Sequence, residues 1–250
     1  MDHTDQRGAH TDAAPSESDS PPRDPAEARA DTFARLAVDM HDADGVEETV
    51  ETVVRFALQA VNCSFAGVAL HTRGGKPEIP AVTDPVVAEI YKFQLDAQDG
   101  PLMATMRDQS TVLVRDTATE GRWPEWAAKV ATLGVRSVLD VPLTLGTSGT
   151  VGVLGLYSLV PDGFDTDDEA IAHILARHAS VAVASARREE NLATAVDARK
   201  LVGQAMGILM ERYSIDGDRA FTVLRRYSQD TNTKLRDVAQ QLIDTRRLPR

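Results

Sequence analysis

Two long apolar runs that lie close together in the chain constrain its fold more than any other feature. They cover Val135–Leu145 and Thr150–Val160, and only the Gly-containing segment Gly146–Gly149 separates them. Apolar runs on either side of a short loop of this kind predict a β-hairpin. The chain is therefore expected to be built on an antiparallel sheet.

The segments before this hairpin supply a second pair of strands. Cys63–Thr72 and Ile79–Thr83 have strand character, and the turn Arg73–Lys76 joins them. A helix is expected from Pro85 to Ala97, because an N-cap residue followed by proline is a typical helix start. Further short elements are expected at Leu102–Arg107, Thr111–Arg115 and Trp123–Gly134. Paired strands separated by helices predict an α+β fold, an antiparallel sheet with flanking helices.

Two further helices are marked by capping signals. Asp44 has Glu47 three residues later, and Thr166 opens the acidic segment Thr166–Glu169; both patterns predict a capping box. The second helix is expected to run past residue 190. Residues 1–24 are rich in Asp, Ser and Pro and are expected to be a disordered acidic tail. The predicted division is therefore a tail at 1–24, a sensor-like domain at 25–185, and a connecting helix with a helical domain at 186–248.

Composition excludes several classes of protein. A hydrophobic fraction of 42% supports a real core, while no apolar run reaches the ~18 residues that a membrane-spanning helix needs. The first residues lack the basic and apolar segments of a secretory signal. Cys63 is the single cysteine, so no intramolecular disulfide forms. A cytoplasmic protein without membrane contact is expected.

No pattern in the chain predicts catalysis. The six histidines and Cys63 form neither a nucleophilic triad nor a zinc pattern, and no Gly-rich phosphate loop is present. The net charge of −11 is unevenly distributed, since residues 190–250 carry 11 Lys/Arg and 8 Asp/Glu. The chain is therefore expected to be a binding protein and not an enzyme, with an acidic body and a weakly basic C-terminal module.

Several segments of the body resemble a known sensor module. They are Gly100-Pro101, Arg122-Trp123-Pro124, Gly134–Val138, Val141-Pro142-Leu143, Gly152–Ser158 and Gly163-Phe164. These segments resemble the GAF domains of actinobacterial regulators. The resemblance implies a domain that binds a small molecule and transmits a signal.

The resemblance does not identify the ligand or any cofactor. Phe164, Asp168 and Glu169 fit the second half of the motif of cyclic-nucleotide-binding GAF domains, but Leu156-Tyr157-Ser158 stands where its Asn-Lys pair is expected. A plain helix start also explains the acidic residues, and Cys63 is read as a core filler. Three aromatic residues are expected to line a ligand pocket: Trp123, Trp126 and Tyr157. For the two tryptophans, anchoring a loop over the sheet is the alternative.

The helix that begins near Thr166 has a partly apolar heptad seam. One row of the seam reads Ile171, His178, Ser185, Leu192, Arg199 and Met206, and the other Ile174, Val181, Arg188, Ala195, Val202 and Leu209. A seam that is polar in its middle favours a long helix that dimerises weakly. A hinge near Glu189–Asn191 between two separate helices is the alternative. The favoured interpretation makes the protein a homodimer through its connecting helix.

Three short runs of helical period end the chain, and they resemble a second known family. The matching residues, in order, are Gln204-Ala205, Gly207–Met210, Ala220-Phe221, Leu224-Arg225, Ser228, Asn232, Lys234-Leu235 and Asp237-Val238-Ala239. They resemble the ANTAR domain, a three-helix RNA-binding module of transcription antitermination regulators. One residue departs from the pattern, because Met206 stands where the family usually has a lysine. That departure predicts weaker or altered phosphate binding if the lysine contacts RNA.

Eight polar residues of this module are left for its outer surface and are the expected RNA contacts. They are Arg199, Lys200, Gln204, Arg212, Arg225, Arg226, Lys234 and Arg236. Basic groups position phosphates, and amide or guanidinium groups can read unpaired bases. The expected function is a signal-responsive antitermination regulator that binds RNA stem-loops. A DNA-binding regulator that uses the last helix, and a sensor whose output module binds protein, are the two alternatives.

Overall fold

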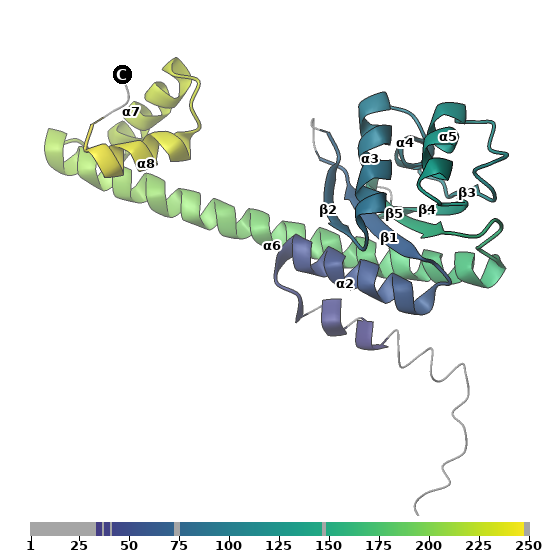
Figure 1. Ribbon diagram of the computed structural model, residues 1–250. Helices are drawn as coiled ribbons and strands as arrows, with labels where there is room; N and C mark the ends of the chain where they lie inside the picture. The colour runs from purple at the N-terminus through teal and green to yellow at the C-terminus, as the bar shows by residue number, and fades with distance from the viewer. Residues whose placement is uncertain (1–33, 37, 41, 73–75, 147–148, 248–250) are drawn as a thin grey trace, which may run out of the picture. The chain divides into compact units, whose positions relative to one another are not determined.

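A five-stranded antiparallel sheet organises the first part of the protein (Figure 1). The computed structural model describes residues 34–36, 38–40, 42–72, 76–146 and 149–247. The strands, in the order β2-β1-β5-β4-β3 across the sheet, are β1 Phe65–Leu70, β2 Glu78–Val82, β3 Val112–Val114, β4 Ser137–Thr144 and β5 Thr150–Ser158. Both predicted hairpins form, since β1 pairs with β2 and β4 pairs with β5 along its whole length. The α+β fold class is confirmed.

The described residues include seven helices with assigned bounds, of which some cover the sheet and the last ones form a separate cluster. They are α2 Gly45–Ala60, α3 Pro85–Ala97, α4 Pro101–Asp108, α5 Pro124–Thr132, α6 Thr166–Tyr213, α7 Gly217–Asp230 and α8 Leu235–Thr245. Proline opens α3, α4 and α5, where its fixed φ suits the first helical position and its missing N–H costs nothing. None of the helices in the described ranges has both the length and the apolar character needed to cross a bilayer.

The sheet separates two apolar layers. Helices α3, α4 and α5 pack over one face, where Val138, Val153 and Tyr157 project from the strands into a cluster with Ile90 and Leu102. Because side chains alternate along a strand, the intervening residues of β4 and β5 face the other way. That second face is covered by α2 and the first part of α6 (Figure 1). The sensor-like part therefore has a core on each side of one sheet.

Both predicted capping boxes are wrong in detail. Asp44 takes the N-cap position of α2 as predicted, but its side chain makes no capping bond, and its N–H donates to Glu48 and not to Glu47, at 2.7 Å. The capping box of α6 begins one residue early, with Asp165 accepting from the Asp168 N–H at 2.9 Å. Before α8 the N-cap position belongs to Lys234, which makes no capping bond. Short polar residues cluster at each of these helix starts, and the backbone geometry decides which of them takes the cap position.

The last three helical segments enclose a small core of their own. The end of α6 contributes Ala205 and Leu209, which pack with residues of α7 and α8 such as Leu224 and Leu242. Phe221 of α7 is 38% exposed. Asp216 caps α7, accepting from the Arg219 N–H at 2.8 Å.

The connecting helix is continuous. Helix α6 runs for 48 residues without interruption through Glu189–Asn191, where the alternative placed a hinge. The predicted tail at 1–24 and the centres of the two predicted turns, residues 73–75 and 147–148, lie outside the described residues.

Candidate functional site

A group of buried polar side chains lies under α3, inside the otherwise apolar face of the sheet. Asp140 of β4, Tyr157 of β5 and Tyr91 of α3 form this group, which we call the Asp140 cluster. All three are fully buried. Neither carboxyl oxygen of Asp140 and neither tyrosine hydroxyl has a hydrogen-bond partner of good geometry among the described residues. Buried polar groups are nearly always paired, so a cluster of unpaired ones is a candidate functional site.

Gly155 makes room for the cluster. It lies opposite Asp140 in the β4–β5 register. A Cβ atom at this position would lie 2.5 Å from the Tyr91 hydroxyl, 2.8 Å from the Tyr157 hydroxyl and 2.9 Å from an Asp140 carboxyl oxygen. The three oxygens therefore converge over bare backbone, which any larger residue would fill.

Burial sets the protonation state of the cluster. It raises the pKa of the Asp140 carboxyl to about 8, so the group is mainly neutral at pH 7. Burial raises the pKa of the Tyr91 hydroxyl above its ordinary value, and the nearby charge of Asp140 raises it further. Tyr157 shifts in the same direction, again chiefly through burial. The cluster can therefore donate hydrogen bonds to a polar group that reaches it.

The three residues predicted to line a ligand pocket are only partly brought together. Tyr157 belongs to the Asp140 cluster, and Trp126 is 2% exposed in the same apolar layer. Trp123 contacts Trp126 edge to face, with ring centroids 6.3 Å apart, and the Arg122 guanidinium lies over its ring. Tyr157 and Trp126 are buried in the core. A ligand could contact them only if the helices α3, α4 and α5 moved away from this face of the sheet.

Asp140, Tyr91 and Gly155 were not among the site residues predicted from the sequence. The available signal was the lone acidic residue in the apolar strand Ser137–Thr144, at a position where alternation points it into the core. The convergence with Tyr91 could not be inferred, because Tyr91 and Asp140 are 49 positions apart in the chain.

Residues that resemble a cyclic-nucleotide motif have structural partners here. Phe164 is buried, and an Asp168 carboxyl oxygen accepts from the Asn62 N–H at 3.0 Å. This bond ties the end of α2 to the start of α6. Cys63 lies nearby, and burial, followed by the charge of Asp168, raises the pKa of its thiol to about 12. A thiol in that state is a poor nucleophile. Cys63 is half-buried, so it lies at the edge of the core and does not fill its interior.

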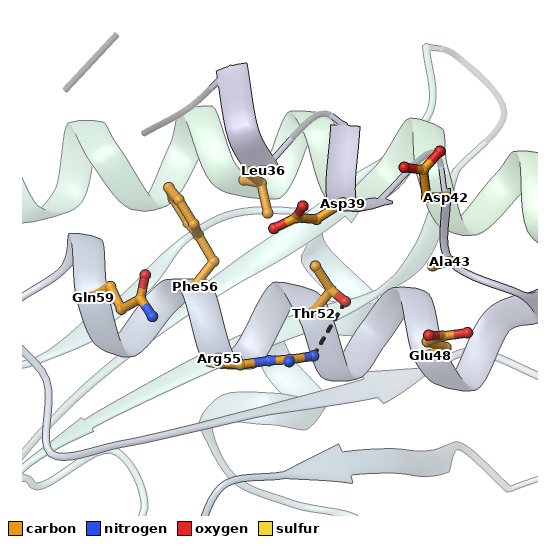
Figure 2. Close-up of a pocket in the computed structure, with 9 residues that line it drawn as sticks. All are labelled: Leu36, Asp39, Asp42, Ala43, Glu48, Thr52, Arg55, Phe56 and Gln59. Carbon is orange, nitrogen blue, oxygen red and sulfur yellow. Dashed lines mark hydrogen bonds between the residues drawn. The ribbon is translucent and has the colours of Figure 1, made fainter. Parts of the chain in front are cut away.

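A hollow of about 380 Å³ lies between the helical residues before α2 and α2 itself (Figure 2). Asp39, Asp42 and Glu48 contribute carboxylates to its wall, and Arg55 bonds to Thr52 on α2. Among the described residues, no group of three or more His, Cys, Asp and Glu side chains is arranged to hold a metal ion. The hollow is an acidic surface feature.

All eight residues predicted to contact RNA are exposed. Two of them already have acidic partners: Arg226 lies 3.6 Å from Asp230 and Arg236 lies 3.1 Å from Asp237. The Arg212 guanidinium donates to the carbonyl oxygen of Arg246. Four of the predicted cations have neither an acidic partner nor a side-chain hydrogen bond among the described residues, and they are Arg199, Lys200, Arg225 and Lys234. These four are the charges most readily available to phosphates.

Met206 takes no part in this exposed set. Its side chain is half-buried against the small core, and its terminal methyl lies 3.6 Å from the point where a Cβ of Gly217 would be. Met206 therefore contributes to the packing of α6 on the small core, close to the start of α7. Its effect on RNA affinity stays a prediction.

The chain has a sheet-based domain with a buried polar cluster. One helix joins this domain to a small helical module with exposed cations. This arrangement is that of a sensor protein with a separate module for binding a partner. The comparisons agree with this class. The GAF domain family matches residues 43–184 and the ANTAR domain family matches residues 190–243. The chain belongs to the GAF family and carries an ANTAR domain on the C-terminal side of the GAF domain. It combines a signal sensor with an RNA-binding output.

Two solved structures are similar in fold to the first part of the chain. The GAF domain of a phosphoenolpyruvate-protein phosphotransferase from Coxiella burnetii is 15% identical with a TM-score of 0.52, covering 67% of this chain and 99% of that chain. Free methionine-R-sulfoxide reductase from Neisseria meningitidis, in complex with its substrate, is also 15% identical with a TM-score of 0.51, covering 68% and 96%. At such identities the likeness shows the fold alone. No curated protein sequence matches the chain significantly.

Proposed function

We propose that this protein is a cytoplasmic transcription antitermination regulator that binds RNA stem-loops when its GAF domain receives a small-molecule signal. It acts by binding, without a catalytic step. The ordered match of residues 190–243 to the ANTAR domain carries this proposal. The unpaired cations on the same three helices support it, because positive groups without intramolecular partners can neutralise phosphates at little cost.

Competition in a gel-shift assay tests the RNA output. The full chain is expected to bind a labelled pool of RNA hairpins with a fixed stem and a randomised loop. Unlabelled hairpins should displace the pool, whereas duplex DNA of the same stem sequence should not. If duplex DNA alone displaces it, the DNA-binding alternative is correct. If no nucleic acid binds, a protein-binding output is favoured.

The connecting helix supports the proposed homodimer. Val181 is 62% exposed and Leu192 is 65% exposed, and both lie on the predicted heptad seam. Exposed apolar side chains at seam positions are typical of a helix that pairs with a second copy. A groove of about 380 Å³ runs beside Val181. Light scattering of the full chain, which measures its mass in solution, checks this part of the proposal.

One contact joins the GAF domain to the connecting helix and supports transmission of a signal through that helix. The Val46 N–H at the start of α2 donates to a Glu190 carboxyl oxygen on α6 at 2.8 Å. Gly45 has a φ of +82° and comes so close to Glu190 that a Cβ there would lie 2.8 Å from the carboxyl oxygen. A carboxylate from a distant helix thus takes the place of the missing Asp44 cap and favours the positive end of α2.

Replacing Glu190 with alanine is expected to loosen the start of α2. Loss of this capping bond should cost about 1 kcal/mol, and amide exchange at Val46 should accelerate accordingly. Glu189→Ala is the matched control, because among the described residues the Glu189 carboxylate accepts a hydrogen bond from the Ser185 hydroxyl on its own helix and none from α2. Hydrogen exchange measured by NMR distinguishes the two variants. Equal exchange rates at Val46 in both would show that Glu190 does not hold α2.

A further inference from the structure

Among the described residues, α6 and α8 of the ANTAR domain border a groove of about 470 Å³. Its lining comprises Gln204, Gly207, Ile208, Glu211, Arg212, Ile243 and Arg246. This volume is within the ~300–1,000 Å³ of typical small-molecule sites. The groove contains two of the residues predicted to contact RNA, Gln204 and Arg212.

The floor of the groove is lined by apolar side chains, and one wall is helix backbone without a side chain. Ile208 and Ile243 are half-buried and pack on the small core, so they present a fixed apolar surface. At Gly207 a Cβ would meet no atom within 4 Å, which leaves helix backbone exposed along that wall. A flat ring can lie against such a surface without displacing a side chain.

The remaining lining is polar and carries more positive than negative charge. Gln204 offers an amide that both donates and accepts, and Arg212 offers a guanidinium whose position is held by its bond to the Arg246 carbonyl. Glu211 can accept from an amino group, while Arg212 and Arg246 outnumber it in charge. An unpaired nucleotide can be recognised by three kinds of contact. These are apolar contact with the face of the base, hydrogen bonds to its edge, and cations near its phosphate.

We propose that this groove binds one unpaired base of the RNA loop, with the base lying over Ile208 and Ile243 and its edge facing Gln204 and Arg212. The inference rests on the proposed RNA-binding function and deepens it by locating where loop sequence is read. The unpaired cations elsewhere on the domain, such as Lys200 and Lys234, then position the backbone and carry no sequence information.

Two glycines on the same helix provide a matched test. Gly203 and Gly207 are both exposed within α6, and a Cβ at either would meet no atom within 4 Å, but only Gly207 lines the groove. Gly207→Leu is expected to fill the groove and Gly203→Leu to leave it open. Both changes remove a helix glycine, so neither should lower helix content. Circular dichroism and thermal unfolding confirm that both variants fold.

The readout is binding of the full chain to the randomised-loop hairpin pool, followed by sequencing of the bound RNA. Gly207→Leu should lose roughly 10-fold or more in affinity, the scale of losing the burial of one apolar group, together with its loop preference. Gly203→Leu should keep both within about 2-fold. Wild-type affinity in Gly207→Leu, or an equal loss in both variants, would overturn the groove while leaving RNA binding intact. Absence of hairpin binding by the wild-type chain would overturn the proposed function as well.

Discussion

The stability of the Asp140→Asn variant relative to the wild-type sensor domain is expected to increase by about 3 to 4 kcal/mol between pH 5 and pH 8. The folded-state pKa of about 8 lies above the ordinary value of 3.8. Between these values the unfolded chain releases a proton that the folded domain keeps, so wild-type stability falls as the pH rises. Asparagine has nearly the same shape and no proton to lose, so the variant lacks this decline.

Denaturant unfolding followed by tryptophan fluorescence measures this difference. The only two tryptophans, Trp123 and Trp126, lie in the sensor domain, so the signal is not mixed with unfolding of the ANTAR domain. Asp116→Asn is a control of opposite sign. The Ala118 N–H, followed by Arg136, lowers the pKa of Asp116, so that carboxylate stabilises the fold at neutral pH and less in acid. Parallel pH profiles for wild type and Asp140→Asn would contradict a neutral, buried Asp140.

Removing the unpaired cations is expected to weaken RNA binding far more than removing the paired ones. Lys200 and Lys234 have no acidic partner among the described residues, whereas Arg226 and Arg236 each lie beside an aspartate. The double variant Lys200→Ala/Lys234→Ala should lose roughly 10-fold in affinity at low salt. Its slope of log affinity against log salt should become shallower by about 1.5, the release expected from two phosphate contacts.

The double variant Arg226→Ala/Arg236→Ala removes the same net charge and serves as the matched control. Each arginine must leave its aspartate before it can contact a phosphate, so the loss of affinity and the change in slope should both be smaller. Fluorescence anisotropy with a labelled hairpin over a series of salt concentrations measures both quantities. Identical slopes for the two double variants would mean that the RNA responds to overall charge and not to these particular side chains.

Much of the fold could be predicted because local signals agreed with the tertiary structure. The hairpin of β4 and β5, the proline-led helices and the uninterrupted α6 each follow from patterns within a few neighbouring residues. The bonds at helix starts were predicted less well. Asp44 takes the N-cap position as predicted, but the bond that stabilises the start of α2 runs from the Val46 N–H to Glu190, and no local pattern reports a partner 144 residues away.

The candidate sites, too, were predictable where local patterns determine them and not where distant contacts do. Residues 199–236 could be selected as an RNA-binding surface because amphipathic helices separate exposed polar positions from buried ones, and all eight selected residues are exposed. Which of those cations are already paired was not predictable. An ion pair depends on the rotamers that neighbouring side chains adopt in the folded chain.

By itself, the sequence determined the α+β class, the order of the two domains and the outward face of the last helices, because periodicity and turn residues act over short distances. Only the tertiary structure decided that Asp140, Tyr91 and Tyr157 converge over Gly155. It also decided that Met206 packs inward and that a groove opens between α6 and α8. Each of these features depends on contacts between elements far apart in the chain, where packing and exclusion of water, and not local preference, fix the geometry.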